Sequence, residues 1–175
     1  MNEITGLRAF HLDRARYRRS AWVTQRALWA VAVHRLGEEV AAAPRPLRLI
    51  IDPLHVLLTL WIQCVTGIEL GRGARLGPGL LIMHGSGIVV HGNAILGSDC
   101  VLLQGVTIGN RRAGGPAPVL GDRVELNAHA HVLGGVTVGD DCTVGALSLV
   151  LQDVPAGSVV VGAPARPLPV RANID

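Results

Sequence analysis

A six-residue period governs the hydrophobic positions of the chain from Leu70 onward. The sequence divides into units that each begin with Leu, Ile or Val, and Gly takes the second place in seven of the thirteen units. The fifth place of every regular unit holds Ala, Leu, Ser, Cys or Val. A helical period of about 3.6 residues does not produce this pattern, whereas short strands joined by tight turns do. The pattern predicts a mainly β solenoid of parallel strands, with the first and fifth residues of each unit inside.

The patterning divides the chain into three regions. Residues 1–66 lack the period and are predicted to be α-helical, residues 67–166 form the repeats, and residues 167–175 form a tail. Within the repeats, residues 110–118 replace one unit with a Gly- and Pro-rich segment that should project as a loop. A projecting loop is where solenoids often place function, although it could also serve as a packing arm.

The most apolar run of the helical region extends from Pro53 to Val65. Asp52 suits an N-cap, Pro53 suits the first helical position and Gly67 suits the stop, so we expect one helix between these signals. The run is shorter than the roughly 20 residues that a membrane span requires. We therefore expect a helix that packs against the rest of the protein and does not span a membrane.

Charge is distributed unevenly along the chain. Residues 1–50 contain nine Arg and four acidic residues, whereas the remainder has seven Arg and nine acidic residues. A basic helical region could contact nucleic acid or a membrane surface. Because neither aromatic nor Gly-Arg motifs accompany the charge, we interpret it as a solvated helix face. The polar start of the chain does not resemble a secretory signal, so we expect a cytoplasmic protein.

The three cysteines are far apart and fit neither a disulfide framework nor a paired metal motif. Cys100 and Cys142 both occupy the fifth place of a unit, which predicts that they face inward and fill space.

The repeats resemble the hexapeptide-repeat acyltransferases. Three segments, "TGIELGRGARLGPGLLIMHGSGIVV", "LLQGVTIGN" and "SVVVGAPAR", are similar to serine O-acetyltransferases within that family. The resemblance implies a left-handed parallel β-helix with three units per coil, preceded by a short helical region. It also implies a homotrimer that binds acetyl-CoA between neighbouring subunits.

Three units per coil predict which units lie above one another. The unit from Ile88 to Ile95 is counted as eight residues and the one from Ile108 to Val119 as twelve. Four stacked units then begin at Ile82, Leu102, Leu126 and Val144, and their third residues are His84, Gln104, Ala128 and Ala146. This column places one imidazole at the end of a smooth surface along which a thin ligand such as pantetheine could lie.

The resemblance assigns roles to these residues. It implies that His84 is the general base, with Glu69 as the acidic partner that orients the imidazole; an imidazole with a pKa near 6.5 suits such a base. Candidate contacts of the acetyl-CoA co-substrate are Gly109, Asn110, Ala128, Ala146 and Arg166. The backbone N–H groups near Gly109 and Asn110 are candidate oxyanion donors.

The acceptor is less defined than the donor. Candidate acceptor contacts are Met83, His91, Arg111 and Arg112. Serine acetyltransferases carry Asp where this chain has Met83, and Arg-His where it has Pro116 and Ala117. The expected acceptor is a small hydroxyl compound: L-serine or a serine-like metabolite if Arg111 or Arg112 compensates, and otherwise a sugar or polysaccharide precursor.

Two further alternatives stay open. The chain could be a trimeric scaffold without catalysis, which would not require His84 and Glu69 in register. Zinc could bind among His84, His91, His129 and His131, but it needs three or four convergent ligands and the spacing does not show them, so no metal is expected.

Overall fold

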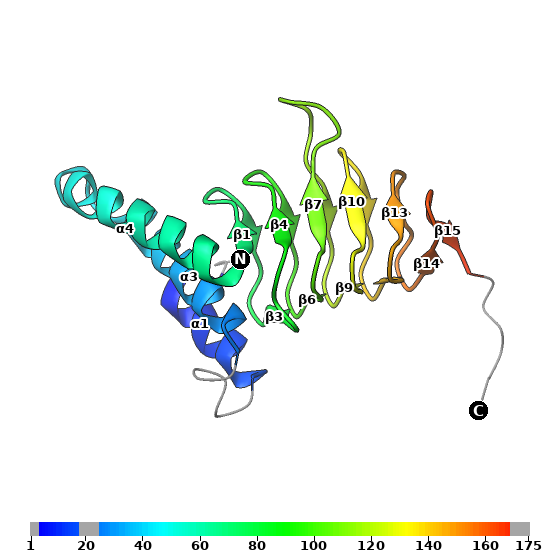
Figure 1. Ribbon diagram of the computed structural model, residues 1–175, viewed down its shortest axis with the longest axis horizontal. Coiled ribbons are helices and arrows are strands. Elements are labelled where there is room, and N and C mark those ends of the chain that lie inside the picture. The colour runs from blue at the N-terminus through cyan, green and yellow to red at the C-terminus, as the bar shows by residue number, and fades with distance from the viewer. Residues whose placement is uncertain (1–3, 18–24, 169–175) are drawn as a thin grey trace.

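The computed structural model describes residues 4–17 and 25–168. Three helices form one end of the molecule and a column of short strands forms the rest (Figure 1). The helices are α1 (Gly6–Ala15), α3 (Ala27–Ala42) and α4 (Arg45–Thr66), and α3 lies between α1 and α4. The predicted tail lies mostly outside the described residues.

Successive strands are distributed in turn among three sheets. Sheet 1 contains β1 (Ile68–Leu70), β4 (Ile88–Val90), β7 (Thr107–Gly109), β10 (His131–Leu133) and β13 (Leu149–Val150). Sheet 2 contains β2 (Arg75–Leu76), β5 (Ile95–Leu96), β8 (Val119–Leu120) and β11 (Thr137–Val138). Sheet 3 contains β3 (Leu81–Ile82), β6 (Val101–Leu102), β9 (Glu125–Leu126), β12 (Thr143–Val144), β14 (Val159–Val161) and β15 (Arg166–Pro167).

The arrangement is the predicted parallel β-helix. Each strand pairs in parallel with the strand three positions later in sequence, as β1 does with β4, except at the C-terminal end. There β15 pairs antiparallel with β14. The first residues of the units form vertical columns inside the three sheets, and the sheet 1 column runs Leu70, Val90, Ile108, Val132 and Val150. These side chains are at most 5% exposed, so the core consists of stacked aliphatic rungs.

The two cysteines at fifth places are buried, as predicted. Burial raises the pKa of the Cys100 thiol to about 11. The thiol therefore stays protonated at neutral pH and serves as packing.

The register corrects the placement of the eight-residue unit. Val90 pairs with Leu70 and Ile108, so a new unit begins at Val90 and not at Ile88. Ile88 is buried between Ile68 and the following coil, as fifth residues are. The long unit is therefore Ile82–Val89, and its two extra residues lie in the turn after β3.

Helix α4 also differs from the prediction. It begins at Arg45 and contains Pro53 in its interior, so Asp52 is not the N-cap, while Gly67 ends it in a left-handed conformation as expected. At 22 residues it is long and apolar enough to span a membrane by length and composition. Only 17% of its most apolar window is buried, so most of its apolar surface does not pack against the protein.

A buried ion pair joins the helices to the first coil. Asp13 of α1 accepts a hydrogen bond of 2.8 Å from Arg35 Nε of α3, and both side chains are fully buried. The guanidinium also donates to the carbonyls of Leu76 and Gly77, at 2.6 and 2.8 Å. The Leu80 N–H donates to Asp13 Oδ1 at 2.8 Å. Because each charge is paired and hydrogen-bonded, the network tolerates burial and fixes how the helices dock.

Replacing Asp13 with Asn should destabilise the protein strongly, because it removes the fully buried counter-ion of Arg35 and leaves only the partly exposed Glu38, 3.1 Å from Nη1, to balance its charge. We expect the free energy of unfolding, measured by urea denaturation, to fall by about 3 kcal/mol. The matched control is Arg123→Gln, which breaks the exposed pair between Arg123 and Asp141 and should leave the urea midpoint unchanged. Equal losses in the two variants would contradict a special role for the buried pair.

Candidate functional site

His84 lies in the expanded turn between β3 and β4. Its side chain is exposed and its backbone is left-handed, with φ of 53°. The chain enters the turn under restraint, because the Ile82 N–H donates to the Tyr17 hydroxyl at 2.8 Å and the Met83 N–H donates to the Leu102 carbonyl at 2.9 Å. Burial raises the pKa of Tyr17 to about 12, so this anchor remains a neutral hydroxyl. The imidazole is thus exposed on a backbone that is held in place.

Gly85 allows the turn to approach the helices closely. A Cβ at Gly85 would lie 2.7 Å from Cδ1 of Ile68 and 2.8 Å from Cβ of Ala27, the first residue of α3. No side chain fits between these contacts. The helical region therefore buttresses the turn that carries His84.

The two extra residues of the turn are His84 and Gly85. The Gly105 N–H bonds to the Ser86 carbonyl at 2.9 Å, and in the coils above His129 and Leu147 bond in the same way to Gln104 and Ala128. The column of third residues is consequently Ser86, Gln104, Ala128 and Ala146. The prediction that His84 heads this column was wrong. The imidazole protrudes beside it, because a parallel ladder cannot absorb two additional residues within its stacked positions.

The residues of this column are small except for Gln104. The Oε1 atom of Gln104 is buried and has no hydrogen-bond partner among the described residues. Ala128 and Ala146 lie further along the same corner of the solenoid, where sheet 3 leads into sheet 1. We call this line of turns the 3–1 corner.

Glu69 lies on the outer face of sheet 1. It occupies the middle of β1, is exposed, and pairs in register with Val89 of β4. Gly67, two residues earlier, would bring a Cβ to within 3.4 Å of the Gly87 nitrogen in the His84 turn. The fold thus brings Glu69 and the His84 turn to neighbouring positions. Among the described residues, no hydrogen bond joins the side chains of Glu69 and His84.

Five further predicted residues gather where sheet 1 leads into sheet 2, the 1–2 corner: His91, Gly109, Asn110, Arg111 and Arg112. His91 follows β4, and its Nδ1 accepts the Asn93 N–H at 3.1 Å. Gly109 ends β7 and Asn110 begins the projecting loop, which extends from the column as predicted (Figure 1). Strands of two or three residues separate this corner from the 3–1 corner by about 10 Å. One chain therefore does not bring His84 together with Gly109 and Asn110.

Arg111 anchors the loop and does not point to His84. Its Nε donates to the Leu133 carbonyl at 3.2 Å, and its Nη2 donates to the Leu151 carbonyl. Arg111 and Arg112 both line a cleft of about 610 Å³ under the loop, together with Pro116. Arg166 of β15 lies at a smaller cleft nearby, which Arg111 also lines.

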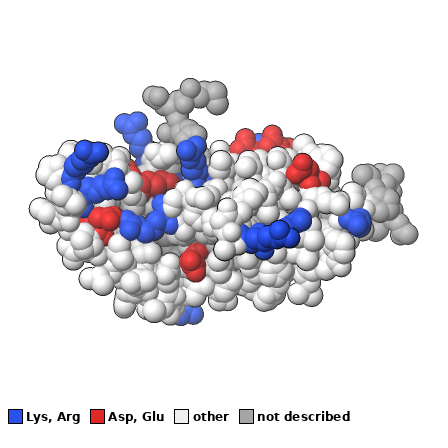
Figure 2. Space-filling model, turned by 90° about the horizontal axis from the view of Figure 1, so that it is seen from above, with Lys and Arg blue, Asp and Glu red and all other residues white. Residues whose placement is uncertain are grey.

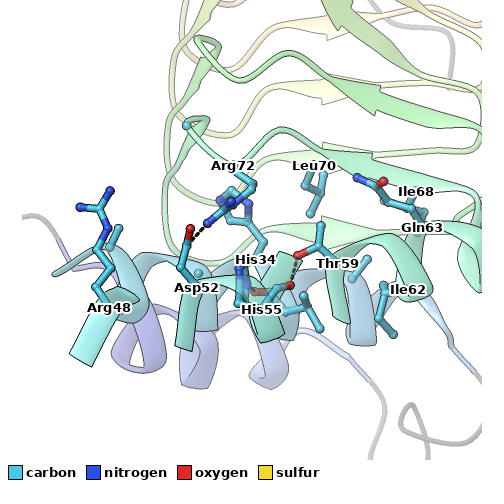
Figure 3. Close-up of a pocket in the computed structure, with 15 residues that line it drawn as sticks. His34, Arg48, Asp52, His55, Thr59, Ile62, Gln63, Ile68, Leu70 and Arg72 are labelled. Carbon is cyan, nitrogen blue, oxygen red and sulfur yellow. Dashed lines mark hydrogen bonds and ion pairs between the residues drawn. The ribbon is translucent and has the colours of Figure 1, made fainter. Parts of the chain in front are cut away.

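A separate cavity of about 320 Å³ lies between α3, α4 and the first coil (Figure 3). His34 and His55 line it from the two helices, and an ion pair between Asp52 and Arg72 closes one side. Burial and the charge of Arg35 lower the pKa of His34 to about 4, so this imidazole is neutral at pH 7. None of the predicted site residues lines this cavity.

The described residues do not contain a group of three or more His, Cys, Asp and Glu that could hold a metal ion. His129 and His131 are separated by one residue and lie in different parts of the coil. His129 adopts a left-handed turn conformation with φ of 57°, whereas His131 begins β10.

The family model, the relatives and the solved structure that match this chain are all named as transferases. Residues 117–152 match the family model "Bacterial transferase hexapeptide (six repeats)". A serine acetyltransferase of Synechococcus elongatus is 43% identical over 112 residues, covering 63% of this chain and 46% of that protein. A protein named for acetyl transfer in colanic acid biosynthesis, WcaB of Escherichia coli, is 43% identical over 115 residues, covering 65% of this chain and 71% of that protein.

A solved structure extends the similarity to the helical region. The serine acetyltransferase of Neisseria gonorrhoeae in complex with serine superposes with a TM-score of 0.79 at 29% identity, covering 92% of this chain and 68% of that one. The chain spans about half to three fifths of the length of the curated serine acetyltransferases that it matches.

The anchoring of the loop by Arg111 can be tested by hydrogen–deuterium exchange. Replacing Arg111 with Ala removes both contacts to the carbonyls of Leu133 and Leu151, so amide exchange across residues 110–117 should become at least about tenfold faster. Arg112→Ala is the matched control and should leave the exchange rates unchanged. Equal acceleration in both variants would show that the loop does not depend on this anchor.

Proposed function

This chain belongs to the hexapeptide-repeat acyltransferases related to serine acetyltransferases, and we propose that it transfers the acetyl group of acetyl-CoA to the hydroxyl of a small acceptor. The observation that carries the proposal is the His84 turn. An imidazole is exposed on an expanded turn that is restrained by Tyr17 and by the close contact at Gly85, with a carboxylate on the neighbouring rung. A structural turn of this fold needs neither the two extra residues nor the histidine.

In the proposed reaction, His84 takes the proton of the acceptor hydroxyl while the hydroxyl oxygen attacks the thioester carbonyl carbon. Glu69 stabilises the imidazolium that forms and orients its ring. Collapse of the tetrahedral intermediate breaks the C–S bond, and the proton held by His84 passes to the departing CoA thiolate. A positioned base of this kind contributes about 10²–10⁴-fold to the rate.

The two corners suggest how the site is completed. We propose a homotrimer in which the 3–1 corner of one subunit faces the 1–2 corner of its neighbour. Pantetheine would lie along Ala128 and Ala146, where small side chains leave room for it. Backbone N–H groups near Gly109 and Asn110 of the neighbouring subunit would then approach the thioester oxygen that carries the developing charge. The separation of the corners within one chain is the reason for this arrangement.

L-serine or a serine-like metabolite is the proposed acceptor, in keeping with the named relatives. The second candidate is a sugar hydroxyl, which the similarity to the colanic acid protein and the apolar Met83 favour. Arg111 does not offer its Nε–Nη2 edge to an acceptor carboxylate in the observed conformation, because both of these nitrogens donate to main-chain carbonyls. Arg112 and His91 remain the candidate polar contacts of the acceptor. We propose a cytoplasmic location and no metal requirement.

His84→Asn should reduce acetyl transfer by about 10²–10⁴-fold, because Asn tolerates the left-handed backbone but cannot take the proton. The measurement is thiol release from acetyl-CoA with a saturating acceptor. The matched control is His129→Asn, which changes the other left-handed histidine of the β-helix and should retain turnover. Full activity of the His84 variant would refute its role as the base.

Thiol release measured with serine, homoserine and several nucleotide-linked sugars distinguishes the two acceptors. For serine, Met83→Asp should raise kcat/KM about tenfold, because it supplies a carboxylate for the ammonium group. Met83→Leu is the control and should leave this value unchanged. Acceleration by a sugar but not by serine would assign the chain to the second candidate.

A further inference from the structure

One side of α4 packs against the protein. His55, Ile62 and Thr66 are its buried residues, and His55 Nε2 donates to the Val33 carbonyl of α3 at 2.9 Å. The acidic residue of the helix, Asp52, lies on the same side and pairs with Arg72 of the first coil (Figure 3). The polar groups of α4 are therefore concentrated where it meets α3 and the β-helix.

The opposite side of α4 is apolar and uncovered. At 100° per residue, its exposed apolar side chains occupy an uninterrupted arc of about 160° around the helix. We call this surface the α4 face; it consists of Leu47, Leu49, Ile50, Pro53, Leu54, Leu57, Leu60, Trp61 and Cys64. Its large side chains from Leu47 to Trp61 are 48 to 78% exposed. An apolar surface of this extent is unusual for a protein face in contact with water alone.

Basic groups flank the α4 face at both ends. Arg45 is exposed at the start of the helix, and Arg26 donates to the Val65 carbonyl near its end, whereas Arg48 lies on the opposite side and lines the cavity with Asp52 and His55 (Figure 3). Figure 2 shows a concentration of basic side chains at the helical end of the molecule. Residues 1–50 have five more basic than acidic residues. This combination of a wide apolar face and flanking arginines is typical of helices that lie in the headgroup region of anionic membranes.

We propose that the α4 face binds the surface of an anionic phospholipid bilayer, with the helix axis parallel to the membrane plane. Phosphate headgroups would contact Arg45 at one end of the helix and Arg26 at the other, while the leucines and Trp61 enter the boundary of the acyl chains. The helix lies on the bilayer and does not cross it, because its other side holds the Asp52–Arg72 pair and the buried His55 contact.

A lipid surface fits the α4 face better than a second copy of the helix. The arc is wider than the two-position seam along which paired helices meet. It also lacks a charged or amide side chain that could fix the register of a partner. A fluid apolar layer requires neither a narrow seam nor a fixed register.

The test is flotation of the full chain with vesicles of phosphatidylcholine and phosphatidylglycerol, compared with vesicles of phosphatidylcholine alone. We expect the protein to float with the mixed vesicles and to do so less as salt concentration rises. Leu54→Asp combined with Leu57→Asp should lower the partition coefficient at least about tenfold, because two charges replace the apolar anchor. Arg45→Gln combined with Arg26→Gln should remove most of the preference for the anionic lipid.

The matched control is Leu12→Asp, which places the same charge on a half-exposed leucine of α1, on the far side of α3. It should float like the unaltered protein. Circular dichroism and thiol release without vesicles should be unchanged in the Leu54/Leu57 variant, which separates lost binding from lost folding. The proposal is overturned if the unaltered protein stays unbound, or if the Leu54/Leu57 variant floats equally well. It is also overturned if light scattering gives that variant a lower molar mass than the unaltered protein, because a second copy of the chain would then cover the α4 face.

Discussion

The parallel hydrogen-bond ladder between successive coils is the constraint on which the rest of this structure depends. The backbone bonds repeat from coil to coil in a fixed register, in which the N–H of a second residue donates to the carbonyl of a first residue in the next coil, as from Gly71 to Val90 or from Gly77 to Leu96. An inward-facing column cannot shift by one residue without turning its aliphatic side chains outward. Extra residues are therefore expelled at the corners. Both insertions into the six-residue period, the turn at His84 and the loop from Asn110, are consequences of this rule.

The helical region does more than cap the solenoid. Arg35 and Asp13 fasten it to the first coil through buried hydrogen bonds, and Tyr17 bonds directly to the strand that precedes His84. The packing of Gly85 against Ala27 adds a steric contact at the same turn. Stability and the candidate chemistry are thus linked, because the network that docks the helices also restrains the backbone of the proposed base.

The candidate residues are distributed over two corners of one chain, and this separation is the basis of the proposed site between subunits. His84 and the small residues of the column lie at one corner, while Gly109, Asn110 and the loop lie at the other. In the proposed homotrimer, unlike corners of two subunits would bring both halves of the site together. The α4 face lies apart from both corners, so contact with a lipid surface and acetyl transfer would not compete for the same residues.

The sequence by itself determined the β-helix, the inward aliphatic rungs, the buried cysteines and the projecting loop, because a short period is imposed locally on every unit. The resemblance to serine O-acetyltransferases singled out His84 and Glu69 together, and their roles stay a prediction. Only the tertiary structure decided that the long unit includes His84 rather than following it, since Ile88 could begin a unit or fill a fifth place equally well by pattern. Tertiary structure likewise decided that α4 starts at Arg45, that Arg111 is bound by main-chain carbonyls, and that one side of α4 is uncovered. Each of these depends on contacts between residues distant in sequence, which a local period does not encode.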